Sequence, residues 1–326
     1  IDIVSPDTIV SEMKAGNYDI AEMPADQLDS YKDASNLNLV GSLESAYEYI
    51  SFNLGKYDEA SEKNIMDENA KMNDVKLRQA IAYAIDTKTA GEKLYNGLYH
   101  PATSLIISFF GDLHDSEVEG YSYDPDKANE LLDEAGYKDV DGDGIREGKD
   151  GKEFKITFAA RKRTEANEAL VQQYIAWWKE VGLNVELYTG RTVEINTFYD
   201  AIQANDASID MYAGGWSTGY DPNPNGLWGE TAPFNMSRFV DEKNTELLDA
   251  IGSVASFDEK TNLKNYKAWQ EYAFEQAFAI PTFESEAITA LNKRVKNFDT
   301  NYGSASENGI ALENIELTAD KGVAAE

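Results

Sequence analysis

An aspartate-rich loop is the group of residues in this sequence whose spacing most clearly suggests chemistry. Three aspartates stand at alternate positions and are followed by a glycine. This pattern is the first half of an EF-hand calcium loop, in which oxygen ligands alternate before a sharp turn. The expected ligands are Asp139, Asp141, Asp143, the carbonyl of Ile145 and Glu147.

The second half of the loop departs from that pattern. The twelfth position is Asp150 instead of a bidentate glutamate, and residues 154–159 predict a strand where an EF-hand has a helix. The alternative is an Asp/Gly-rich loop whose carboxylates accept local backbone hydrogen bonds. If calcium binds, we expect it to hold the loop together without taking part in a reaction.

A second segment, residues 212–228, has the composition of a peptide-binding strand end. It combines paired glycines, which let another backbone approach, with prolines, two tryptophans and one acid. An extended peptide could add to such a strand through main-chain hydrogen bonds. The alternative is that Trp216 and Trp228 belong to the core and that Asp221 starts a turn.

The sequence gives little support for an enzyme. His100 and His114 stand outside any metal or nucleophile motif, and we expect both to be loop residues. Cysteine and a glycine-rich phosphate loop are both missing from the sequence. A secreted carbohydrate-active hydrolase remains the alternative from another class, although 59 acidic residues offer no way to choose a catalytic pair. We predict no enzyme and no required cofactor, with structural Ca²⁺ as the one candidate ion.

The charge of the chain limits its partners. It has 29 basic and 59 acidic residues and a net charge of −30, which would repel nucleic acids and anionic membrane surfaces. Hydrophobic residues make up 42 %, enough for a packed core. The sequence holds no apolar run long enough to span a membrane, and its lack of cysteine is common in exported bacterial proteins.

Alternating helix and strand patterns predict an α/β fold. We expect residues 58–73 to be a surface loop and residues 318–326 to be a tail. The predicted helices cover 6–15, 25–32, 75–85, 125–135, 164–181, 193–204, 242–251 and 259–276. The predicted strands cover 18–23, 37–40, 47–54, 154–159, 184–188, 209–216, 279–283 and 312–317.

An ordered set of motifs resembles the bacterial extracellular solute-binding proteins of the peptide/nickel type, which serve ABC importers. The strongest is residues 73–86, NDVKLRQAIAYAID, which resembles the signature helix of that family. Further similar segments follow in the family's order at 95–102, 123–137, 178–185 and 279–281. The resemblance extends from residue 5 to residue 317.

The resemblance implies a periplasmic-binding-protein-like type II architecture, with two lobes joined by a two-stranded hinge. This chain would be the C-terminal portion, with one complete lobe and part of the other. Residues 1–46 would belong to lobe I, residues 47–284 would form the ligand-binding lobe II, and residues 285–326 would be a return segment into lobe I and a tail.

The resemblance also implies a function. The protein would capture extracellular oligopeptides by hinge closure and pass them to the membrane permease of an ABC importer. It would be a monomeric lipoprotein of the bacterial cell surface or a periplasmic protein. Nickel, haem or a sugar is the alternative ligand.

In that family the ligand-binding strand ends in Gly-Trp, which implies main-chain contacts to the ligand at the corresponding residues here. Members that fix the amino terminus of a peptide have an aspartate three residues after this tryptophan, where this chain has Gly219. The departure favours longer oligopeptides without a rigid N-terminal anchor. The predicted ligand site is Gly215, Trp216, Ser217, Asp221 and Trp228.

Overall fold

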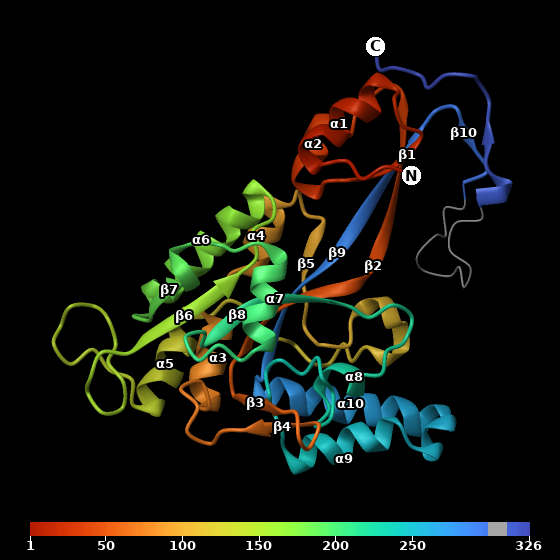
Figure 1. The fold of residues 1–326 in the computed structure, drawn as a ribbon. Coiled ribbons are helices and arrows are strands. Elements are labelled where there is room, and N and C mark those ends of the chain that lie inside the picture. Colours follow the sequence, from red (N-terminus) through yellow and green to blue (C-terminus); the bar gives the residue numbers. More distant parts are fainter. Residues whose placement is uncertain (299–311) are drawn as a thin grey trace. The chain divides into compact units, whose positions relative to one another are not determined.

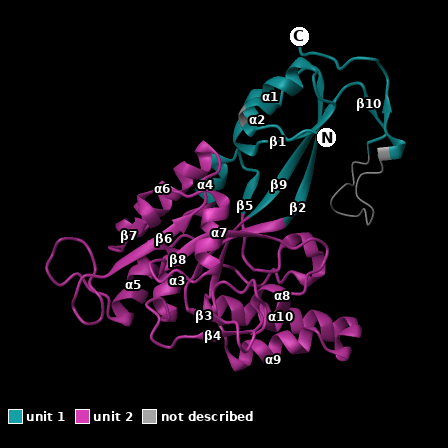
Figure 2. Cartoon of the chain, viewed as in Figure 1, with its two compact units in different colours: residues 1–45, 88–100, 284–326 teal, residues 46–87, 101–283 magenta. Residues whose placement is uncertain are grey.

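The computed structural model describes residues 1–298 and 312–326, which form two compact units (Figure 1, Figure 2). Unit 1 contains residues 1–45, 88–100 and the described part of 284–326, and unit 2 contains residues 46–87 and 101–283. Two of the boundaries fall inside long strands, β2 (Leu37–Phe52) and β9 (Ala279–Asn292). The chain therefore passes between the units within continuous strands.

Unit 1 is built around helix α1 (Pro6–Ala15). Pro6 stands at the first helical position, where its missing N–H is no loss, and Gly16 ends the helix with a φ of 76°. The other elements are β1 (Ile20–Met23), η1 (Ala25–Gln27), α2 (Leu28–Tyr31), α4 (Thr87–Leu94), β5 (Tyr99–Pro101), β10 (Val295–Lys296), η5 (Leu312–Asn314) and β11 (Glu316–Leu317). Its buried core consists of Ile9, Val10, Met13, Met23, Tyr31, Leu37, Ile288 and Ala290.

Unit 2 contains a mixed sheet in the order β2-β8-β6-β7. Strand β8 (Met211–Ser217) is antiparallel to β2 and parallel to β6 (Lys155–Ala160), and β6 is parallel to β7 (Asn184–Leu187). Two shorter strands, β3 (Gly55–Asp58) and β4 (Lys63–Met66), form a hairpin of their own.

Helices of unit 2 pack on this sheet through aromatic side chains. Trp178 of α6 lies with its ring centroid 5.1 Å from that of Phe158 in β6, and its Nε1 donates a hydrogen bond to the Ile81 carbonyl of α3 at 3.0 Å. The helices of this unit are α3 (Val75–Tyr83), α5 (Pro125–Ala135), α6 (Glu165–Glu180), α7 (Ile195–Gln203), α8 (Asn225–Trp228), α9 (Glu242–Ile251) and α10 (Glu259–Gln276). Short 3₁₀ turns are η2 (Ser108–Leu113), η3 (Tyr188–Gly190) and η4 (Val254–Phe257).

The α/β class and most elements agree with the prediction, but several boundaries were wrong. The strands predicted at residues 37–40 and 47–54 form one continuous strand, β2, which ends at Phe52. The predicted loop 58–73 contains β4, whose Asn64 is 2 % exposed because its amide donates to the carbonyls of Glu230 and Ala232 at 2.9 Å each. Strand β9 continues to Asn292, and the predicted last strand is a 3₁₀ turn followed by the two residues of β11.

The division into units differs from the predicted domains at residues 88–100. The prediction assigned them to lobe II, whereas the contacts group them with unit 1. The Asn96 amide donates to the Ala25 carbonyl at 2.8 Å, and Leu98 packs against the core of unit 1. Helix α4, which the sequence analysis did not predict, begins this segment.

Candidate ligand-binding site

In the residues that the structure describes, the C-terminal end of β8 has a strand partner on one side only. Every residue of β8 pairs with a residue of β2, and the pairing ends with Ser217 opposite Ala46. β6 pairs with β8 only as far as Ala213, which lies opposite Ala160. Among the described residues, 214–217 therefore lack a strand on the β6 side. Main-chain groups that point to that side can pair with an added strand.

At two glycines in this segment, a side chain would meet close neighbours. A Cβ at Gly214 would lie 2.8 Å from Cζ of Tyr49, and a Cβ at Gly215 would lie 3.0 Å from Nη2 of Arg161 and 3.2 Å from Oε2 of Glu48. The neighbours are side chains of the protein itself, and the approach of another backbone to these glycines stays a prediction.

Of the two predicted aromatic residues, only one is accessible. Trp216 is half-buried and lies 5.6 Å from the exposed ring of Phe234, measured between centroids. Trp228 is 2 % exposed and packs between Tyr49 and Phe278, at 5.6 and 5.2 Å. Trp228 is therefore a core residue, which corrects its prediction as a ligand contact.

Ser217 and Asp221 are both exposed, but the structure shows a local role for Asp221. Its Oδ1 accepts a hydrogen bond from the N–H of Asn223 at 2.9 Å, which is the Asx turn that an Asp-Pro sequence favours. Gly219, at the position where the resemblance implies an anchoring aspartate, has a φ of 58°.

The tyrosines beside this segment are neutral. Tyr49 and Tyr212 are buried in the sheet, and burial raises the pKa of both phenols well above the ordinary value. They supply apolar surface and no titratable group near neutral pH.

The charged groups beside Gly215 were missed in the sequence analysis. Arg161 and Arg163 follow β6 directly and both pair with Glu48 of β2, with an Nη2–Oε2 distance of 3.2 Å for Arg161. The Arg161 guanidinium also lies over the Tyr199 ring, with Cζ 5.8 Å from the centroid. The run Ala-Ala-Arg-Lys-Arg at the end of a predicted strand was the available signal. The pairing with Glu48 could not be read from it.

The predicted calcium loop brings together part of its expected ligand set. Carboxylate oxygens of Asp139, Asp141 and Glu147 lie within 4.8 Å of one another, in a group that does not include Asp143. Asp143 Oδ1 instead accepts from the N–H of Ile145 at 2.7 Å.

These carboxylates also accept backbone hydrogen bonds inside the loop. The two oxygens of Asp139 accept from the N–H groups of Gly142 and Gly144, at 2.6 and 2.9 Å. Local bonding of this kind is the alternative that the sequence left open, and calcium binding stays a prediction.

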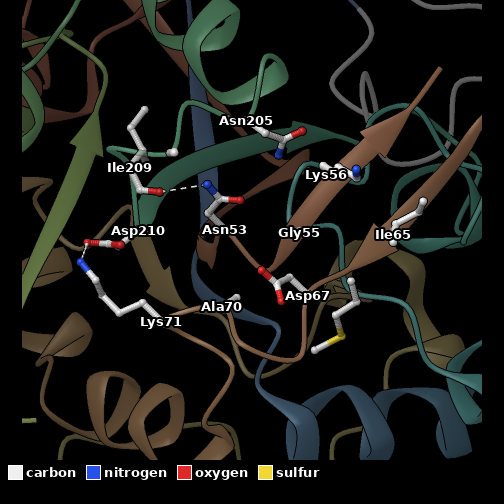
Figure 3. A pocket seen from close by; sticks show the side chains of 12 residues that line it. Asn53, Gly55, Lys56, Ile65, Asp67, Ala70, Lys71, Asn205, Ile209 and Asp210 are labelled. Atoms are coloured by element: carbon white, nitrogen blue, oxygen red, sulfur yellow. Dashed lines mark hydrogen bonds and ion pairs between the residues drawn. The ribbon is translucent and has the colours of Figure 1, made fainter. Parts of the chain in front are cut away.

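A cavity of about 630 Å³ lies at the opposite end of β8, beside the β3–β4 hairpin (Figure 3). Lys71 Nζ and Asp210 Oδ2 form an ion pair there at 2.8 Å, and the Asn53 amide donates to the Ile209 carbonyl at 3.1 Å. Asp210 also accepts from the N–H of Thr157. These polar groups bond to one another and join β2, β6 and β8.

Among the described residues, no helix is both long enough and apolar enough to cross a bilayer.

Comparisons with known proteins identify the family. Residues 1–238 match the model of "Bacterial extracellular solute-binding proteins, family 5 Middle". The oligopeptide-binding protein OppA of Lactococcus lactis subsp. cremoris is 34 % identical over 93 % of this chain and 51 % of its own length. The heme-binding protein A of Haemophilus influenzae is 26 % identical over 90 % of this chain and 48 % of its own. The chain thus spans about half the length of these relatives.

A solved structure supports the same assignment. Lactococcal OppA, complexed with an endogenous peptide in the closed conformation, superimposes with a TM-score of 0.86 and 34 % identity. The superposition covers 90 % of this chain and 55 % of the OppA chain. The predicted fold class, α/β and periplasmic-binding-protein-like type II, is confirmed. The chain belongs to family 5 of the bacterial extracellular solute-binding proteins.

Proposed function

We propose that this chain is part of a receptor that captures oligopeptides outside the cell membrane and delivers them, chemically unchanged, to the permease of an ABC importer. The observation that carries the proposal is the end of β8, where residues 214–217 have, within the described part of the chain, a strand partner on one side only. A peptide that adds to this edge gains main-chain hydrogen bonds that do not depend on its sequence. The relatives named above as oligopeptide-binding proteins support the same ligand class.

The mechanism that we propose is closure of two lobes over the peptide. The chain passes between its two units inside β2 and β9, and strands of this kind can act as hinges. Ligand binding would shift the population toward the closed state. Receptors of this type would be monomeric and anchored by lipid at the cell surface, or free in the periplasm.

Asp221 and Gly219 bear on how the amino terminus of a peptide would be held. Asp221 is held in a turn with Asn223, and Gly219 has no side chain to meet an ammonium group. We therefore propose binding of longer oligopeptides without a rigid N-terminal anchor. Acetylation of the peptide amino terminus should leave its affinity nearly unchanged, and a collapse of affinity on acetylation would contradict this.

Mass spectrometry of the molecules that co-purify with the full product of the gene tests the ligand class. A ladder of peptides is the expected result. A single haem, sugar or nickel chelate would replace the peptide proposal with one of the alternatives. The carbohydrate-active hydrolase is not favoured by the family assignment, and conversion of a co-purified sugar polymer to shorter products would be needed to revive it.

A further inference from the structure

We propose that Asn225 is a site of spontaneous deamidation, at which the main chain of Gly226 converts the asparagine to aspartate and isoaspartate. The main-chain nitrogen of the glycine loses its proton to solvent base and attacks Cγ of the asparagine amide. The new N–Cγ bond closes a succinimide ring, the Cγ–Nδ2 bond breaks, and ammonia leaves with a proton. Water then opens the ring at either carbonyl. The net change is hydrolysis of an amide, so no oxidant or reductant takes part.

A glycine that directly follows asparagine or aspartate is the sequence in which this ring closes most readily, because glycine has no Cβ to hinder its nitrogen. With aspartate, water leaves in place of ammonia. The described residues contain five such pairs, and a further pair, Asn308-Gly309, lies outside them. The five are Asn96-Gly97, Asp141-Gly142, Asp143-Gly144, Asp150-Gly151 and Asn225-Gly226.

In four of the five pairs, the N–H of the glycine is already bonded to a nearby acceptor. A nitrogen that is held in this way must break its hydrogen bond before it can attack. The acceptors are the Gly91 carbonyl for Gly97 at 3.0 Å, Asp139 for Gly142 and Gly144 at 2.6 and 2.9 Å, and the Gly148 carbonyl for Gly151 at 2.8 Å.

Gly226 is the exception within the described part of the chain. Its N–H lies in the first turn of α8, where a main-chain donor has no partner inside the helix, and no described residue accepts a hydrogen bond from it. Asn225 bonds only through its main chain there, with its N–H to Asn223 Oδ1 and its carbonyl from the N–H of Gly229, at 3.0 Å each. Asn225 and Gly226 are both exposed, so water reaches the reacting atoms.

Asn96 presents the same dipeptide in the opposite state. Its side-chain amide donates a hydrogen bond to the Ala25 carbonyl at 2.8 Å, and the N–H of Gly97 donates to the Gly91 carbonyl. Ring closure at Asn96 would therefore need two hydrogen bonds to open together. At Asn225 it needs only local opening of the single turn of α8. The fold, and not the sequence, distinguishes the two pairs.

The two products would affect the chain differently. Aspartate adds a negative charge at an exposed position and keeps the length of the main chain. Isoaspartate adds one carbon atom to the main chain directly before Leu227 and Trp228, which are 3 % and 2 % exposed. It would also displace the Asn225 carbonyl that accepts from Gly229. We therefore expect the isoaspartate form to melt at a lower temperature than the unmodified protein.

The experiment incubates the full product of the gene at mildly alkaline pH and measures conversion at each pair by peptide mapping and mass spectrometry. Electron-transfer fragmentation distinguishes isoaspartate from aspartate. The same incubation in urea gives the rate for each pair in the unfolded chain, and the ratio of the unfolded rate to the native rate is a protection factor. We expect the protection factor at Asn225 to be at least about tenfold smaller than at Asn96, because two hydrogen bonds protect Asn96.

Matched variants assign the reaction to this pair. Asn225→Gln should abolish the conversion at residue 225, because glutamine must close a larger ring, which forms slowly. Gly226→Ala should slow the conversion by placing a methyl group beside the attacking nitrogen, and a Cβ at Gly226 meets nothing within 4 Å, so the fold should not change. Asn96→Gln is the matched control and should leave the conversion at Asn225 unchanged.

The outcomes decide the proposal without reference to the ligand that the receptor binds. Equal protection factors at Asn225 and Asn96, or a larger one at Asn225, would overturn it. An unchanged rate in Gly226→Ala would contradict the succinimide route. The isoaspartate form, separated by ion-exchange chromatography, tests the consequence. An unchanged melting temperature would show that Leu227 and Trp228 are not displaced.

Discussion

Gly214 and Tyr49 form a cross-strand pair in which one residue has no side chain and the other is an aromatic ring. They stand opposite each other in the antiparallel pairing of β2 and β8. The Tyr49 ring covers Gly214 and continues to Trp228 and Tyr212, with centroids 5.6 and 6.3 Å away. Tyr49 is 4 % exposed, so its ring has little freedom to move aside.

Gly214→Ala should therefore lower the free energy of unfolding by about 1–3 kcal/mol, the usual cost of adding a methyl group to a filled core. Urea unfolding followed by tryptophan fluorescence measures the change. Gly226→Ala is the control, because a Cβ there meets nothing within 4 Å. Equal destabilisation by both substitutions would show that the Tyr49 contact is not the cause.

The C-terminal segment, residues 318–326, was predicted from the sequence to be a tail. In the structure it is bonded to unit 1 through the main chain of Val323. Asn292 and Val323 exchange hydrogen bonds of 2.8 and 3.0 Å, and the Asn36 amide donates to the Val323 carbonyl at 2.6 Å. Both asparagines are completely buried, and the backbone of Gly322 packs against that of Gly16.

Asn292→Ala should destabilise unit 1 by about 1–3 kcal/mol, because it removes a completely buried side chain and its two hydrogen bonds to Val323. Deletion of residues 322–326 should cost a similar amount. The two changes together should cost less than their sum, since they remove the same hydrogen bonds. Thermal unfolding followed by circular dichroism measures all three, with the exposed Asn314→Ala as control. Strict additivity would contradict the docking of this segment.

The aspartate loop is the second element with a testable role. Within the described residues, Asp139, Asp141 and Glu147 approach one another and form no ion pair with a basic side chain. A divalent cation would relieve their mutual repulsion. We predict that excess calcium raises the melting temperature relative to chelator. Asp141→Asn should weaken this shift, and Asp126→Asn, on helix α5, should not. Identical melting temperatures in calcium and in chelator would contradict calcium binding, and the carboxylates would then serve only as acceptors of local backbone hydrogen bonds.

Helices and their caps were the most predictable elements. Pro6, Gly16 and Asp124 act locally, so α1 and α5 begin and end where the sequence indicates. Long-range partners decide the rest. Asn64 lies in a polar stretch, but it is a buried strand residue whose amide donates hydrogen bonds to the carbonyls of residues 230 and 232. No local pattern reveals these partners.

The candidate site divides in the same way. The Gly-Trp end of β8 was predicted from its residues. Trp228 was assigned to the ligand because the sequence alone does not distinguish a core aromatic residue from one that lines a binding site. Glu48 and Arg161 are 113 residues apart, and the registers of β2 and of β6 against β8 bring them together. Sequence spacing contains no information on these registers.

At the scale of the whole molecule, buried tyrosines make stability depend on alkaline pH. Burial raises the pKa of Tyr31, Tyr137 and Tyr266 to about 12. A tyrosine in an unfolded chain titrates near pH 10, so between about pH 10 and 12 the native state holds protons that the unfolded state releases. The stability from these groups is complete below about pH 10 and is lost as the pH rises toward 12.

Arg78 acts in the opposite direction, because burial lowers its pKa to about 10. The Arg78 guanidinium loses its proton at a lower pH in the native state than in the unfolded state. Its contribution to the stability of the protein therefore increases as the pH rises above 10. Burial raises the pKa of further tyrosines, including Tyr47 and Tyr121, and these outweigh the single arginine. We therefore expect the melting temperature to fall steeply once the pH passes about 10.

Salt separates this effect from general charge repulsion. The chain already has a net charge of −30, and each ionised tyrosine adds to its self-repulsion, which salt screens. Proton release from buried phenols is much less sensitive to salt. Melting curves from about pH 8 to 11, at low and high sodium chloride, should therefore keep most of their pH dependence in high salt, and Tyr266→Phe should reduce the slope. A pH dependence that disappears in high salt would show that surface charge, and not the buried tyrosines, destabilises the protein in alkali.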